Sequence, residues 1–81
     1  MPFFVYILRN TEGRFYIGQT SDLTMRLQRH SEGMVFWTKS RGPWELVFSQ
    51  QFNTRSEAMA EERRLKDLKS NKVLAAYIAQ R

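Results

Sequence analysis

Residues 3–18 of this chain read FFVYILRNTEGRFYIG. Aromatic and β-branched residues fill both ends of the stretch and favour extended backbone. Between them lies Asn10-Thr11-Glu12-Gly13, in which asparagine and glycine supply turn conformations. The stretch therefore predicts a β-hairpin with strands at residues 3–9 and 14–18. Gly18 closes the second strand, and a glycine there lets the backbone turn or approach a ligand closely.

A helix is expected next, at residues 23–31. Ser21 and Asp22 are good N-cap residues, and Gly33 follows the segment as a stop. Residues 32–43 then read as a loop.

A third strand is predicted by alternation between apolar and polar residues. The apolar positions are Trp44, Leu46, Phe48 and Phe52, and a period of two is typical of a strand. We expect these four side chains to lie on one face of the sheet.

Two further helices are predicted toward the C-terminus. Thr54 and Glu57 fit a capping box, which starts a helix at Arg55 that runs to about residue 69. Ser70 or Asn71 starts the last helix, at residues 71–79. Its expected apolar stripe consists of Val73, Leu74, Tyr77 and Ile78.

The predicted order ββαβαα lacks the alternation of a parallel βαβ fold. It indicates an α+β fold in which a three-stranded antiparallel sheet is flanked by helices. With 81 residues, the chain has room for a single domain, residues 1–81, with one modest core.

Composition limits the classes of partner and compartment. Thirteen Lys and Arg residues against eight Asp and Glu give a net charge of +5, which favours a polyanion such as nucleic acid. Cysteine is absent, so disulfides and thiolate chemistry are excluded, and we expect the cytoplasm. The apolar N-terminus has no basic start and is too short to cross a membrane.

One face of the helix at residues 23–31 combines apolar and basic side chains. Arg26 and His30 share this face with Leu23 and Leu27 through spacings of three and four. Burying a guanidinium is costly without partners, so Arg26 implies an internal carboxylate or a site open to an anionic ligand. The alternative is that Arg26 lies along the helix edge and His30 caps a carbonyl.

Two tyrosine motifs precede this helix, Val5-Tyr6-Ile7 and Tyr16-Ile17-Gly18. Together with the later Arg26 and His30, they resemble the GIY-YIG endonuclease superfamily, with Phe4-Val5-Tyr6 where Gly-Ile-Tyr would stand. The chain is most similar to small stand-alone bacterial members of the YhbQ type, which are related to the nuclease domain of the excision-repair C subunit (UvrC-like).

The resemblance implies a DNA endonuclease that depends on a divalent metal, Mg2+ or Mn2+. The family register places the metal ligand at Glu62, although a helical wheel alone leaves Glu61 equally near the inner face; Glu57 is assigned to the helix cap. Tyr6 is expected to be the general base, its phenol eased toward ionisation by the cation and Arg26.

The remaining catalytic roles follow from the same resemblance. Tyr16 would orient water or phosphate, Arg26 would bind the cleaved phosphate, and His30 would be the proton shuttle or an alternative base. Asn71 is the candidate for the asparagine that many relatives carry after the metal helix.

DNA contacts are expected in the loop before the third strand. Lys39 and Arg41 would contact the backbone, and Trp37 would stack on an unpaired base. The alternative is a solvated loop held by a core tryptophan. The basic run Arg63-Arg64-Lys66-Lys69-Lys72 is interpreted as a solvated helix face.

Two other functions fit the same sequence. A catalytically weak or inactive member of the fold would bind nucleic acid without cutting it, and a structural protein of a ribosome-like assembly would need only the size and charge. A lone nuclease domain should bind weakly, so a homodimer or a larger repair partner would complete its binding surface.

Overall fold

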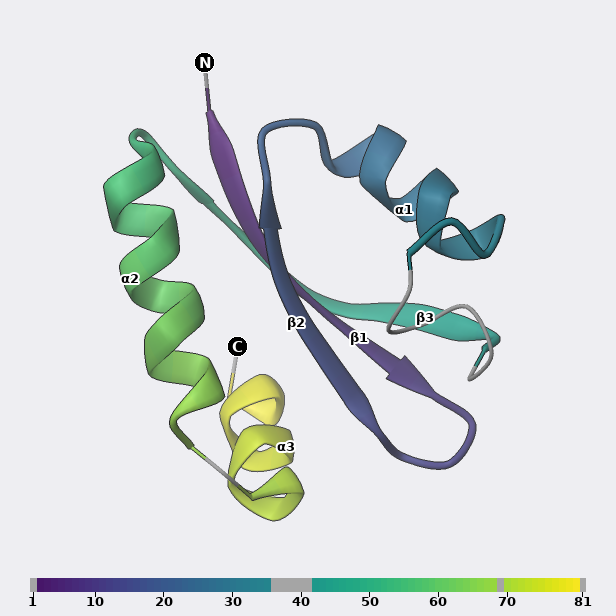
Figure 1. The fold of residues 1–81 in the computed structure, drawn as a ribbon. Coiled ribbons are helices and arrows are strands. Elements are labelled where there is room, and N and C mark those ends of the chain that lie inside the picture. Colours follow the sequence, from purple (N-terminus) through teal and green to yellow (C-terminus); the bar gives the residue numbers. More distant parts are fainter. Residues whose placement is uncertain (1, 36–41, 69, 81) are drawn as a thin grey trace.

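The computed structural model describes residues 2–35, 42–68 and 70–80. It contains three strands and three helices in the predicted order ββαβαα (Figure 1). These elements are β1 (Phe3–Asn10), β2 (Phe15–Thr20), α1 (Leu23–Ser31), β3 (Trp44–Phe52), α2 (Arg55–Lys66) and α3 (Asn71–Ala79). The predicted α+β fold is therefore confirmed.

The hairpin is closed by the side chain of Asn10. Its Oδ1 atom accepts hydrogen bonds from the backbone N–H groups of Glu12 and Arg14, at 3.0 Å and 2.8 Å. Gly13 adopts a positive φ of 82°, which glycine accommodates without strain. This turn fixes a register in which Tyr6 lies opposite Gly18. β2 continues to Thr20, two residues beyond its predicted end.

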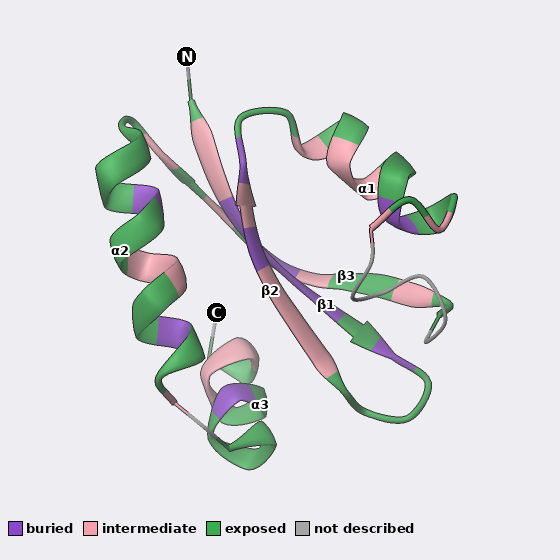
Figure 2. Ribbon diagram, in the orientation of Figure 1, coloured by how far each residue is buried: buried purple, intermediate pink, exposed green. Residues whose placement is uncertain are grey.

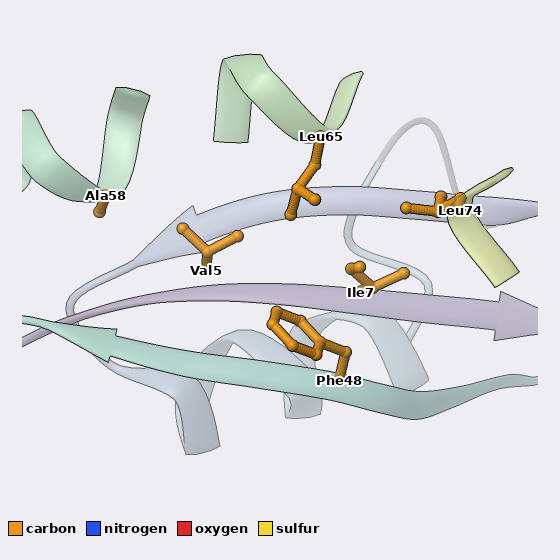
Figure 3. Packing of buried hydrophobic residues seen from close by; sticks show 6 residues of the cluster. All are labelled: Val5, Ile7, Phe48, Ala58, Leu65 and Leu74. Atoms are coloured by element: carbon orange, nitrogen blue, oxygen red, sulfur yellow. The ribbon is translucent and has the colours of Figure 1, made fainter. Parts of the chain in front are cut away.

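β1 is the central strand of an antiparallel sheet with the order β2-β1-β3. Successive side chains of a strand point to opposite faces. Val5 and Ile7 pack with α2 and α3, where Figure 3 shows them beside Phe48, Ala58 and Leu65. Tyr6 and Leu8 therefore point to the other face, which α1 covers (Figure 1).

A β-bulge in β3 contradicts the simple alternation that the sequence predicted. Ile7 pairs with Phe48 while the next residue, Leu8, pairs with Leu46, so Val47 is the extra residue. The bulge places Leu46 and Phe48 on opposite faces. Leu46 is 41% exposed, whereas Val47 packs against the core.

The three helices start where capping chemistry predicts. Asp22 accepts a hydrogen bond from the backbone of Met25, Thr54 forms a capping box with Glu57, and Ser70 caps α3. α2 ends earlier than expected, at Lys66. Helix α1 ends at Ser31, followed by Gly33 with a φ of 74°.

The predicted apolar stripe of α3 is wrong at one position. Leu74 is buried and Tyr77 and Ile78 pack against the core, but Val73 is exposed. Figure 2 shows that only a narrow side of this short helix is covered. Val73 lies outside that side, because it is turned about 100° around the helix from Leu74, whereas Tyr77 and Ile78 follow Leu74 by three and four residues and return to its side.

The described residues contain no candidate for a membrane-spanning helix. None of their helices is both long and apolar enough to span a bilayer.

Candidate active site

Three aromatic rings from three different elements meet on the α1 face of the sheet. The Tyr6 hydroxyl and the Nε2 atom of His30 are hydrogen-bonded at 2.9 Å. The Tyr16 ring lies edge-on to His30 with centroids 4.9 Å apart, and the Tyr6 centroid is 5.7 Å from that of His30 and 6.2 Å from that of Tyr16. We call these three residues the ring cluster.

Gly18 makes room for the ring of Tyr6. A Cβ atom at position 18 would lie 2.5 Å from the Tyr6 hydroxyl oxygen and 2.7 Å from its Cζ atom. Real Cβ atoms do not approach other atoms so closely, and the Tyr6 side chain is fully buried. The strand continues beyond Gly18, so this glycine accommodates a catalytic candidate and does not turn the chain into α1.

The protonation states of Tyr6 and His30 follow from their burial. Burial raises the pKa of Tyr6 well above its usual value, Tyr16 adds to the increase, and the Arg26 guanidinium lowers it only in part. Burial, followed by the charge of Arg26, lowers the pKa of His30 below 6.5. At neutral pH both groups are therefore uncharged. For Tyr6, burial raises the pKa by more than Arg26 lowers it, so Arg26 does not ease ionisation to the extent that the resemblance implied.

The tautomer of the neutral His30 ring sets the direction of the hydrogen bond. With the imidazole proton on Nδ1, the Tyr6 phenol O–H donates to Nε2, whereas with the proton on Nε2, the ring donates to the phenol oxygen. His30 is held by a side chain of the ring cluster, so the predicted alternative of a purely carbonyl-capping histidine is not what the structure shows.

Arg26 is half-buried on α1, one turn before His30. Its charge acts on both Tyr6 and His30, so it lies beside the ring cluster. Within residues 2–35, 42–68 and 70–80, no carboxylate lies within ion-pair distance of its guanidinium. Of the two partners that the sequence allowed, an anionic ligand therefore fits better than an internal carboxylate.

Glu61 and Glu62, which a helical wheel does not separate, have different surroundings. Glu61 accepts hydrogen bonds from Arg64 Nε at 2.9 Å and from the Tyr77 hydroxyl at 3.0 Å, and so links α2 to α3. Glu62 forms an ion pair with Lys66 Nζ at 3.1 Å, and its side chain is 21% exposed. Glu61 thus has a structural role, whereas Glu62 is held by one flexible ammonium group.

Glu62 is linked to a groove beside β2 through its ion-pair partner. Its partner Lys66, one turn along the same helix side, lines a groove together with Tyr16 of β2. Within the described residues, however, no hydrogen bond or ion pair connects Glu62 to the ring cluster or to Arg26.

A divalent cation is compatible with this carboxylate. No cluster of three or more His, Asp or Glu side chains exists in the described part of the chain. Mg2+ accepts one or two protein carboxylates and takes its other ligands from water and substrate phosphate. Glu62 therefore fits as a single protein ligand.

The predicted DNA contacts Lys39, Arg41 and Trp37 lie outside the described residues. The structure gives new roles to two residues that the sequence analysis interpreted differently: Gly18 makes room for the Tyr6 ring, and Lys66 pairs with Glu62. Gly18 could have been found by counting the hairpin register back from the turn to Tyr6. Lys66 could have been found from its spacing of four residues after Glu62, which is typical of a helical ion pair.

Comparisons with known proteins agree with this architecture. The family model described as the GIY-YIG catalytic domain matches residues 2–74. A UPF0213 protein of Oceanobacillus iheyensis is 44% identical over 66 residues, covering 80% of this chain and 77% of that protein. A UPF0213 protein of Streptococcus agalactiae is 35% identical over 81 residues, covering 99% and 91%.

A solved structure supports the same relation. The solution NMR structure of a UPF0213 protein from Bacillus halodurans superposes with a TM-score of 0.61 at 35% identity. The match covers 95% of this chain and 83% of that one.

Proposed function

Because this chain belongs to the GIY-YIG catalytic domain family, we propose that it is a divalent-metal-dependent endonuclease that hydrolyses phosphodiester bonds in branched, damaged or single-stranded DNA, as in DNA repair. The observation that carries the proposal is the 2.9 Å hydrogen bond between Tyr6 and His30 within the ring cluster. Arg26 lies beside this cluster, and among the described residues no carboxylate pairs with it. A protein that only binds nucleic acid has no need of two buried groups that can pass a proton between them.

Tyr6 and His30 move the proton of the attacking water. A free Tyr6 phenolate is costly, since burial raises the pKa of this phenol. When the Tyr6 oxygen accepts a proton from water, its own proton passes to Nε2 of neutral His30 along the existing hydrogen bond. His30 is thus the shuttle; direct proton uptake by His30 is the alternative that the same geometry allows.

Arg26 and Tyr16 act on the phosphate. The planar guanidinium binds two phosphate oxygens at once and stabilises the charge that develops during the reaction. Tyr16 packs against His30 and orients the water or the phosphate through its hydroxyl group.

Glu62 would hold the metal ion, Mg2+ or Mn2+. When bound, such an ion stabilises negative charge on the reacting phosphate and the leaving oxygen. The half-buried carboxylate and its exchangeable Lys66 partner support this role.

The test is incubation of the purified protein with branched, single-stranded and duplex DNA, with Mg2+, with Mn2+ and with chelator. We expect metal-dependent cleavage that Glu62→Ala abolishes and that Tyr6→Phe slows by about 10²–10⁴-fold. Glu45→Ala is the matched control, because Glu45 is also paired with one basic side chain, Arg9, at 3.0 Å but on another element. It should cleave normally.

Undiminished cleavage by Glu62→Ala would contradict the assignment of the metal ligand. If the wild-type protein binds these DNAs but cuts none of them, the chain is a binding module of the same fold.

A further inference from the structure

A groove lies between β2 and the two helices α2 and α3, with a volume of about 790 Å3. Its lining residues are Arg14, Phe15, Tyr16, Ile17, Trp44, Leu65, Lys66, Leu68, Ser70, Asn71 and Leu74. Aromatic and aliphatic side chains thus share the groove with two cations, a hydroxyl and an amide. This combination suits a ligand with flat apolar parts and repeated negative charges.

The two cations of the groove are available to a ligand. The Arg14 side chain is 65% exposed and its nearest acid, Glu12, is 3.6 Å away. The Lys66 side chain is 56% exposed and contacts Glu62 at 3.1 Å. Ion pairs this exposed are weak, so a phosphate can compete for both cations.

The groove is connected to the candidate active site through Tyr16. This residue lines the groove, and its ring lies 4.9 Å from that of His30. Figure 1 shows β2, an edge strand of the sheet, between α1 on one side and α2 with α3 on the other, so a nucleic-acid strand that crosses this edge reaches both regions.

We propose that this groove binds the nucleic-acid strand next to the cleaved bond, with Arg14 and Lys66 contacting its phosphates. The groove has the size of sites that hold one small ligand, roughly 300–1,000 Å3, so it has room for a short stretch of a single strand. The apolar lining contacts sugars and bases, as in other proteins that bind single strands without sequence preference. This inference rests on the proposed function and adds where the substrate lies.

The experiment measures binding of a fluorescent single-stranded oligonucleotide in chelator, as a function of salt, by fluorescence anisotropy. The test variant is Arg14→Gln with Lys66→Gln. We expect weaker binding, and a slope of log affinity against log salt that is smaller by about 1 for each lost contact.

Arg9→Gln with Arg55→Gln is the matched control. It removes the same charge, but Arg9 pairs with Glu45 and Arg55 lies over the Phe3 ring, and neither lines this groove. The control should keep the wild-type slope. Thermal unfolding of both double variants verifies that they are folded.

Equal losses in the two double variants would overturn the proposal, because the general positive charge would then account for binding. Wild-type binding and cleavage by the groove variant would also overturn it, while the proposed nuclease function would stand. A wild-type protein that neither binds nor cuts nucleic acid would instead refute the proposed function, and the groove assignment with it.

Discussion

Replacing Gly18 by alanine tests whether the Tyr6 ring requires a residue without a side chain at this position of β2. The new Cβ atom would lie 2.5 Å from the Tyr6 hydroxyl oxygen, 2.7 Å from Cζ and 3.0 Å from Cε1. The ring has no solvent-exposed surface and is hydrogen-bonded to His30 at 2.9 Å, so it cannot move without breaking that bond or shifting β2. Overpacking of this kind costs about 1–3 kcal/mol.

We therefore expect Gly18→Ala to lower the free energy of unfolding by about 1–3 kcal/mol, measured by urea denaturation. Because the ring must leave its place beside His30, DNA cleavage should fall more than the loss of folded protein explains. Adding Tyr6→Phe removes the oxygen with the shortest contact. The double variant should then be more stable than the sum of the single effects predicts, by about 0.5 kcal/mol or more.

Gly13→Ala is the control for the general cost of losing a glycine. Position 13 has a φ of 82° and no atom within 4 Å of an added Cβ, so the change strains only the turn. It should destabilise the fold by about 1 kcal/mol without a specific loss of cleavage. The reasoning would be refuted if Gly18→Ala were as stable as wild type and equally active.

The remaining predictions concern three separate contacts. The pKa of His30, followed by NMR of the only histidine in the chain, should lie below 6.5 and rise in Arg26→Gln, because the charge of Arg26 lowers it. Since the folded pKa is the lower one, this group's contribution to stability is complete above the unfolded pKa of about 6.5 and declines as the pH falls to the folded pKa. Glu61→Gln should lower the free energy of unfolding by about 1 kcal/mol, because it weakens the link between α2 and α3, whereas Glu62→Gln should change it by less than about 0.5 kcal/mol. Lys66→Met should raise the affinity for Mn2+ by about 1.4- to 5-fold in calorimetry, which corresponds to losing a competing ion pair of about 0.2–1 kcal/mol.

Each of these predictions has a control of the same type. Arg29→Gln, on the exposed side of α1, should leave the pKa of His30 nearly unchanged. Lys72→Met, on α3, should leave Mn2+ affinity at the wild-type value. Each contact would be contradicted by a specific result. These results are a His30 pKa that does not change in Arg26→Gln, a Glu62→Gln variant that is less stable than Glu61→Gln, and an unchanged affinity for Mn2+ in Lys66→Met.

The sequence by itself determined the order and approximate bounds of the elements. Hairpin, caps and helix periodicity depend on residues close together in the chain, and α1 and α3 begin and end as predicted. The inward side of α1 also follows from local spacing, so Arg26 and His30 could be assigned to one face. The paired tyrosine motifs then indicated the family.

Only the tertiary structure decided how these parts meet. The bulge at Val47 depends on pairing between distant strands, and Leu46 was therefore placed on the wrong face by its spacing alone. The difference between Glu61 and Glu62 depends on Tyr77 of another helix. The neutral state of Tyr6 depends on burial under α1, because desolvation arises from contacts between elements and has no signature in the residues next to it in the chain.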